Sequence, residues 1–153
     1  MKVAGFEFPD DLFFHVEHQV WARLHGDGSA TVGITALGIE LAGGEVFMCR
    51  PKTVGTVLVQ GQGLAVVELA KAIVSVKSPV AGAVLAVNPL LAATPERVHA
   101  DPFGSGWLAR LALSAWPADL AALVHGEAVA APMQHHAWLH RQAERPAGGQ
   151  GGA

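Results

Sequence analysis

The stretch that decides the fold is VVELAKAIVSV, residues 66–76, in which a single lysine, Lys71, stands between two β-branched runs. Valine and isoleucine on both sides favour two strands. An unpaired ammonium is costly inside a strand because it would have to leave water. We therefore expect Lys71 at or near the turn of a hairpin, where its amine projects into solvent. A cation raised on a rigid β scaffold is accessible to an enzyme that modifies lysines; the alternative is an ordinary surface lysine.

Outward from this hairpin, short apolar runs alternate with glycine and proline, which is typical of a mainly β domain. Thr35 is a suitable N-cap for a short internal helix over residues 36–41, which Gly43 and Gly44 would end. The spacing of the strands favours two antiparallel sheets in a sandwich or small barrel. The expected strands are residues 19–24, 30–34, 45–50, 54–59, 64–69, 72–77, 83–87 and 108–113.

The C-terminal part of the sequence favours loops and helices rather than strands. We expect a loop after residue 89, a helix over residues 114–124, where leucine and valine recur at helical spacing, and a second helix from Met133 to Glu144. Residues 148–153 are glycine-rich and are expected to be disordered. The prediction is one domain over residues 1–125, followed by a helical extension and tail over residues 126–153.

Composition excludes several classes of function. With 51% apolar and 15% charged residues, the 153-residue chain is expected to fold around one core. A net charge of −3, with no lysine or arginine run, gives no reason to expect nucleic acid. Charged residues and prolines interrupt the most apolar stretch, so we expect no membrane span, and acidic residues near the N-terminus argue against a signal peptide. The single cysteine, Cys49, excludes an internal disulfide and fits the cytoplasm.

Eight short motifs occur in an order that is more specific than any of them alone. Together they resemble the glycine cleavage H-protein family, within the lipoyl-domain superfamily, from His18 to Ser114. The motifs are His18 with Trp21, GDGSATVGIT at 26–35, VF at 46–47, VG at 54–55, ELAKA at 68–72, SPVAG at 78–82, VNP at 87–89 and DPFGSGWL at 101–108.

The resemblance implies a lipoyl-type barrel-sandwich hybrid with Lys71 on a hairpin tip, where lipoate is attached covalently through an amide. In the Glu-x-x-Lys-Ala signature, Glu68 would help a lipoate ligase or lipoyl transferase to recognise the site, and Ala72 completes the motif. Biotin is the less suitable cargo, because alanines rather than methionines flank the lysine. His18, Gln19 and Ser75 would lie beside the arm.

The resemblance also implies a carrier rather than an enzyme. The protein would present a dithiol in turn to glycine decarboxylase, aminomethyltransferase and dihydrolipoyl dehydrogenase, at a high effective concentration. We expect it to act as a monomer. The other class of function consistent with the sequence is a lipoyl-like interaction module that is never acylated.

Two substitutions depart from the family pattern. The family commonly has glutamate directly after the matching histidine and aspartate four residues after the lipoyl lysine, where this chain has Gln19 and Ser75. Each carboxylate could pair with the ammonium of an aminomethyl load, a contact worth about 1.5–3 kcal/mol when sheltered. PKTVG at 51–55 is closer to lipoate-binding proteins of sulfur oxidation, which serve a heterodisulfide-reductase-like complex. The residues leave both pathways open, and neighbouring Glu17 or Glu68 could compensate for the lost charges.

Other polar residues have simpler interpretations. His136 and His140 would share one helix face, but they have no companion cysteine or carboxylate at ligand spacing, so we predict a solvated helix and no metal site. Cys49 is expected to be a small packing residue rather than a redox partner of the arm. No nucleophile–base pair or phosphate-binding loop is evident, and we therefore predict no catalytic residue.

Overall fold

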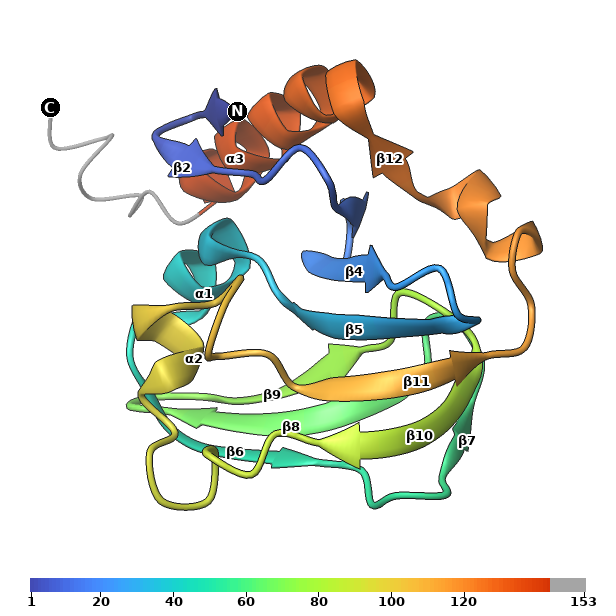
Figure 1. Ribbon diagram of the computed structural model, residues 1–153. Helices are drawn as coiled ribbons and strands as arrows, with labels where there is room; N and C mark the ends of the chain where they lie inside the picture. The colour runs from blue at the N-terminus through green and yellow to red at the C-terminus, as the bar shows by residue number, and fades with distance from the viewer. Residues whose placement is uncertain (144–153) are drawn as a thin grey trace, which may run out of the picture.

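The computed structural model describes residues 1–143, and most of its elements are antiparallel strands (Figure 1). The strands are β1 Lys2–Val3, β2 Phe6–Glu7, β3 Phe13–His15, β4 Val20–Leu24, β5 Ser29–Ile34, β6 Val46–Pro51, β7 Val57–Leu58, β8 Gly63–Leu69, β9 Ile73–Lys77, β10 Gly82–Val87, β11 Ala109–Leu113 and β12 Val124–His125. The helices are α1 Ala36–Ala42, α2 Arg97–Ala100 and α3 Ala130–Ala143, with two 3-10 turns, η1 Ala118–Ala122 and η2 Gly126–Val129.

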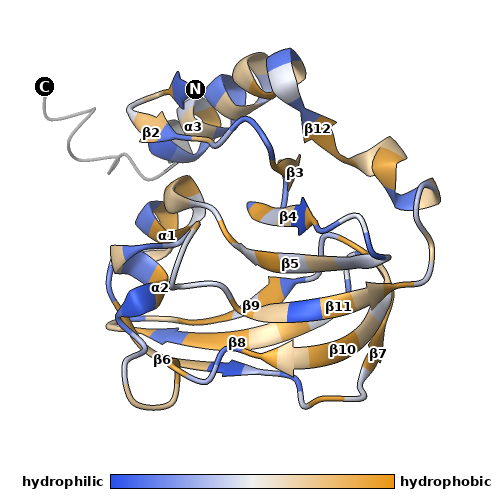
Figure 2. Ribbon diagram, viewed as in Figure 1, coloured by the Kyte–Doolittle hydropathy of each residue, from blue (hydrophilic) through white to orange (hydrophobic). Residues whose placement is uncertain are grey.

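Two sheets enclose the main core. A 7-stranded sheet runs in the order β12-β3-β4-β5-β11-β10-β7, and a 3-stranded sheet runs β6-β8-β9; β1 and β2 form a separate ribbon. The central strands of both sheets are largely hydrophobic (Figure 2), and Val32, Leu111 and Val67 are among the residues buried in the core. The mainly β sandwich with a short internal helix, predicted from the sequence, is confirmed.

The first hairpin and its helix follow the expected local chemistry. β4 and β5 pair antiparallel, and Thr35 caps α1 by accepting a hydrogen bond from the Gly38 N–H at 2.9 Å. Gly43 ends the helix with a φ of 131°, a region that L side chains rarely adopt. This helix lies beside the sheet edge at which the candidate site is built.

A second cluster joins the two ends of the described chain. Phe8 and Phe14 from the N-terminal segment pack with Trp21, Leu37 of α1 and Met133 of α3, all essentially buried. Figure 1 shows the N-terminal ribbon lying beside α3. The C-terminal helix therefore packs on the same hydrophobic cluster as β4 and α1.

Some predicted boundaries were wrong. The strand expected at 54–59 is reduced to β7, and the loop expected after residue 89 contains α2. The helix expected at 114–124 is the short turn η1, because Pro117 interrupts it and Val124 is extended to pair with β3. The predicted C-terminal helices thus become one α-helix, α3, preceded by 3-10 turns. The expected disordered tail at 148–153 lies outside the described residues.

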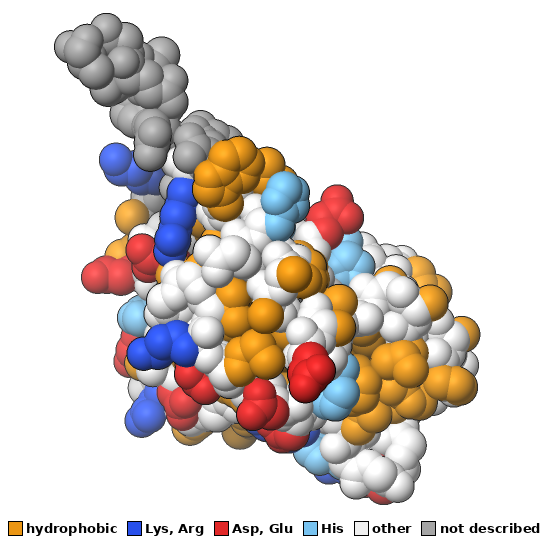
Figure 3. All heavy atoms as spheres, turned by 90° about the horizontal axis from the view of Figure 1, so that it is seen from above, with side chains coloured by type: hydrophobic (Ala, Val, Ile, Leu, Met, Phe, Trp, Pro, Cys, Tyr) orange, Lys and Arg blue, Asp and Glu red, His pale blue; other side chains and the backbone are white. Residues whose placement is uncertain are grey.

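No helix within residues 1–143 is both long enough and apolar enough to cross a membrane. On the face that carries α3, charged side chains of both signs lie among hydrophobic ones (Figure 3).

Candidate functional site

Lys71 lies in the tight turn that joins β8 to β9. Glu68 is paired with Ile73 across the hairpin, and the Leu69 N–H donates to the Ala72 carbonyl at 2.9 Å, so that Ala70 and Lys71 form the two-residue tip. The lysine is exposed. The structure therefore places Lys71 at the position expected from the sequence.

The surroundings of the tip leave the lysine amine accessible. Among the described residues, Lys71 forms no ion pair, although Glu68 is exposed nearby on β8. Ile73 is 73% exposed, so an apolar side chain stands beside the lysine. An accessible primary amine on a hydrogen-bonded hairpin suits the attachment of an acyl group through an amide.

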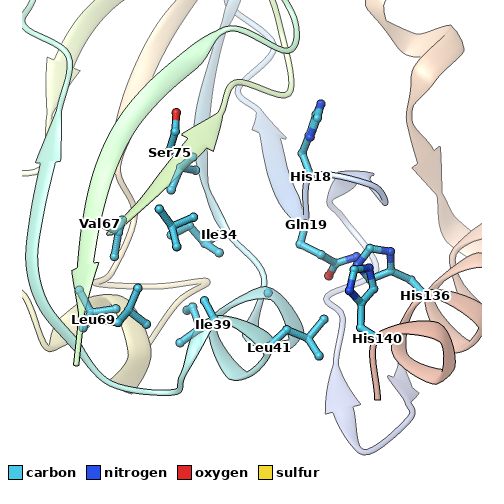
Figure 4. Close-up of a pocket in the computed structure, with 15 residues that line it drawn as sticks. His18, Gln19, Ile34, Ile39, Leu41, Val67, Leu69, Ser75, His136 and His140 are labelled. Carbon is cyan, nitrogen blue, oxygen red and sulfur yellow. The ribbon is translucent and has the colours of Figure 1, made fainter. Parts of the chain in front are cut away.

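A cleft of about 230 Å³ opens beside this hairpin, between β9, α1, the start of β4 and α3 (Figure 4). Its walls are mainly apolar. The polar side chains that line it are Gln19, Ser75 and three histidines, and no carboxylate lines it within the described part of the chain. The lining residues used below are His18, Gln19, Ile39, Leu41, Ser75, His136 and His140.

The buried Gln19 side chain contacts three separate segments of the chain. Its amide nitrogen donates to the Val16 carbonyl at 2.6 Å and contacts the Met133 sulfur at 3.2 Å. Its amide oxygen accepts from the Thr35 hydroxyl at 2.6 Å. Gln19 is only 4% exposed. Because a carboxylate has no hydrogen to donate to the Val16 carbonyl, an amide fits this position better than the glutamate common in the family.

We therefore expect Gln19→Glu to lower the free energy of unfolding by about 2–4 kcal/mol at neutral pH, because it buries a charge and faces it with a carbonyl oxygen. Burial raises the pKa of such a carboxyl, so the loss should shrink as pH falls and the protonated group becomes a donor again. Urea unfolding at pH 7 and at pH 5 measures both effects.

Gln62→Glu is the matched control for this substitution. Gln62 is exposed and uses its oxygen to accept from the Val59 N–H at 2.9 Å, which a carboxylate can also do. We expect a change of less than about 0.5 kcal/mol. If the two glutamate variants were equally stable, the role assigned to the Gln19 amide would be wrong.

Ser75 lies at the rim of the cleft, and its hydroxyl is engaged with a cation. The Lys77 ammonium donates to the Ser75 oxygen at 3.1 Å, and Ser75 is exposed. The position at which the family commonly has aspartate therefore carries a hydroxyl and a neighbouring positive charge.

The histidines of the cleft come from α3 and from the turn between β3 and β4. His18 stacks on His15, with ring centroids 4.4 Å apart, and His136 lies against His140 on α3, with centroids 4.1 Å apart. Burial lowers the pKa of His136, and repulsion from His140 acts in the same direction. Within residues 1–143, no group of three or more histidine, cysteine or acidic residues is placed to hold a metal ion.

His136 and His140 lie on α3, where His140 is exposed, as predicted for a solvated helix, and His136 is half-buried; that both line the cleft was not predicted. The usable signal was the neighbouring pair Met133 and Ala137, whose burial turns this part of α3 toward the protein. Cys49 is on β6, is 6% exposed and does not line the cleft. Burial raises the pKa of its thiol to about 12, so the thiol stays protonated near neutral pH.

Comparison with known proteins identifies the family to which this chain is similar. The family described as "Glycine cleavage H-protein" matches residues 12–136. A glycine cleavage system H protein from Laribacter hongkongensis is 46% identical over 78% of this chain and 92% of its own length. Glycine cleavage system H protein 3 from Aquifex aeolicus is 33% identical over 88% of this chain and 85% of its own length.

A solved structure supports the fold. The crystal structure of a glycine cleavage system H protein from Mycobacterium marinum superposes with a TM-score of 0.67 at 24% identity, over 88% of this chain and 99% of that one. These comparisons give no support to the sulfur-oxidation alternative. The chain belongs to the glycine cleavage H-protein family, the non-catalytic proteins that carry covalent lipoate in the glycine cleavage system.

Proposed function

We propose that Lys71 is the lipoyl attachment site, and that this chain is a cytoplasmic, monomeric carrier whose arm moves a thiol-bound intermediate between the enzymes of glycine cleavage. The observation that carries the proposal is Lys71 itself, exposed at the tip of the β8–β9 hairpin inside the ELAKA motif. When attached, the lipoyl group supplies a disulfide that can be reduced to a dithiol and can hold the intermediate.

The residues around the tip support this assignment. Because β8 and β9 pair as antiparallel strands, the hairpin fixes the backbone of the tip, from which the exposed Lys71 side chain extends. Glu68 and Ala72 flank the turn and are exposed, so a lipoate ligase or lipoyl transferase can contact both. The P, T and L proteins of the system, namely glycine decarboxylase, aminomethyltransferase and dihydrolipoyl dehydrogenase, would then meet the arm at the same exposed tip.

The cleft is the proposed resting place for the far end of the arm. Ser75 on β9 lies four residues after Lys71 of the turn, so it is at most about 13 Å away at the rise of an extended strand. A lysine–lipoyl chain of about a dozen bonds covers a similar length. His18, Gln19 and Ser75 line the cleft, as expected for residues beside the arm.

Reconstitution with glycine decarboxylase tests the function. We expect lipoylated protein to support release of labelled carbon dioxide from carboxyl-labelled glycine, and we expect unmodified protein of the same sequence to support none above background. The two samples differ only in the acyl group, so folding cannot explain the difference. Equal release from both would contradict the carrier role.

Glu68 should affect the acylation step alone. We expect Glu68→Gln to lower the initial rate of lipoylation about tenfold, equivalent to about 1.4 kcal/mol of transition-state binding, without changing the melting temperature, because Glu68 is exposed. Timed intact-mass measurements give the rate. Glu45→Gln, an exposed glutamate before β6, is the matched control; an equal rate for both variants would remove Glu68 from the recognised motif.

A further inference from the structure

The cleft beside the hairpin has an amide and a hydroxyl, Gln19 and Ser75, at the two positions where the family commonly has carboxylates, and three imidazoles also line it. His136 and His140 project from α3 toward the cleft, which Gln19 enters from the opposite side (Figure 4). A neutral imidazole nitrogen can accept a hydrogen bond from an ammonium, whereas an imidazolium cannot and repels it. The chemistry of this cleft toward a cation therefore depends on the protonation of histidine.

We propose that His136 and His140 position the charged end of a cationic load in the cleft, so that the protein shelters the load while both imidazoles are neutral and releases it when they are protonated. The inference rests on the proposed function, because it needs a lipoyl arm on Lys71. It goes further by assigning a positioning role to two residues of α3 and by making shelter of the load sensitive to pH.

Neither β9 nor α1 contributes a carboxylate that could pair with a cation inside the cleft. On the β9 side, Lys77 binds the Ser75 hydroxyl and adds a positive charge at the rim. On the α1 side, the lining contains no titratable residue, since Ile39 and Leu41 form that wall. Glu40, the carboxylate of α1, is not among the residues that line the cleft, so neither of these two elements contributes a carboxylate to the lining.

The remaining titratable groups lie on the third side. Glu17 and His135 line the hollow that adjoins the cleft, and His18 borders both spaces. Glu17 raises the pKa of His136, but burial and the neighbouring histidines outweigh it, so the pKa of His136 is below its ordinary value. Near pH 7 this imidazole is therefore neutral and available as an acceptor, and protonation requires a lower pH.

Binding of a cation in the cleft and protonation of the histidines are thermodynamically linked. A cation held against neutral imidazoles makes them harder to protonate, so its presence should lower the pKa of His136. In return, protonation of the histidines should weaken retention of the cation. Retention should thus rise with pH through the histidine range and then level off. Carboxylates in their place would hold a cation almost equally well from about pH 6 to 8.

A pair of capped arms tests this without any partner enzyme. The arm of lipoylated protein is reduced with a phosphine, and its thiolates are alkylated with 2-bromoethylamine. Each sulfur–carbon bond that forms releases bromide and leaves a primary ammonium. The matched sample is alkylated with iodoacetamide, which releases iodide and leaves an uncharged amide. Cys49 is buried and protonated, so both reagents should spare it.

The readout is the NMR titration of each imidazole. We expect the apparent pKa of His136 to be lower with the ammonium cap than with the amide cap, because a nearby cation disfavours the imidazolium. The ring signals of His25, which is exposed in the β4–β5 turn, should not differ between the two samples. If the apparent pKa of His136 were the same under the ammonium cap and the amide cap, the proposal would be overturned.

A double variant separates this inference from the proposed function. In H136Q/H140Q, the methylene signals of the ammonium cap should lose the pH-dependent shift between about pH 5 and 8 that the unsubstituted protein shows, whereas H25Q should keep it. A shift that persists in the double variant would contradict the role of these histidines. Absence of a lipoyl adduct would instead contradict the assignment of Lys71, and intact mass detects that failure before any titration.

Discussion

Lys71→Arg is expected to abolish carrier activity completely while leaving the fold intact. Arginine keeps the positive charge and suits an exposed turn, but its guanidinium stays protonated and is not a nucleophile for acyl transfer. With no attachment point, the release of labelled carbon dioxide from glycine should fall to the background of the assay without carrier. The melting temperature should remain within about 1–2 °C of the parent, because Lys71 forms no ion pair among the described residues.

Lys77→Arg is the matched control for that variant. Lys77 lies on the same hairpin, at the end of β9, but outside the ELAKA motif. It should be acylated and should support glycine decarboxylation at the rate of the parent. Full activity of Lys71→Arg, or loss of activity in the Lys77 variant alone, would move the attachment site away from Lys71.

Trp21→Ala is expected to have the largest effect on stability, about 3–5 kcal/mol. Trp21 is fully buried, and its indole N–H donates to the Ile34 carbonyl at 3.1 Å. Its ring lies against Gly33, where an added Cβ would be 2.5 Å from the indole. Truncation therefore leaves a large cavity, because Gly33 has no side chain that could fill it. It also leaves the Ile34 carbonyl without its indole donor.

Trp138→Ala provides the control for the tryptophan change. Trp138 is 56% exposed on α3, so its removal should change the free energy of unfolding by less than about 1 kcal/mol. Guanidinium unfolding of both variants measures the difference. If both substitutions lowered the free energy of unfolding by similar amounts, the cluster around Trp21 would not hold β4, α1 and α3 together as described.

Much of the fold was predictable because local chemistry and tertiary structure agree. Lys71 between β-branched runs required a hairpin tip, and Thr35 followed by Gly43 bounded α1 correctly. These features depend on solvation of a charge, on capping and on backbone conformation, all of which act within a few residues. The core strands were recovered for the same reason, since their apolar runs are bounded by glycine and proline.

The candidate site was only partly predictable, because it depends on contacts between distant segments. Gln19 looked like a lost charge in a binding pocket, but its amide is used by Val16, Thr35 and Met133. Val16 is close in sequence, whereas Met133 is on α3. The histidines of α3 likewise face the cleft only because this helix packs against the N-terminal segment, a contact that no local pattern indicates.

The most direct measurement is peptide mass mapping of the unsubstituted protein after co-expression with a lipoate ligase and added lipoate. It asks which of the lysines is acylated when all of them are available. We expect one lipoyl group per chain, located by fragmentation on Lys71. An unchanged intact mass, or a lipoyl group on Lys77 or another lysine with Lys71 unmodified, would contradict it.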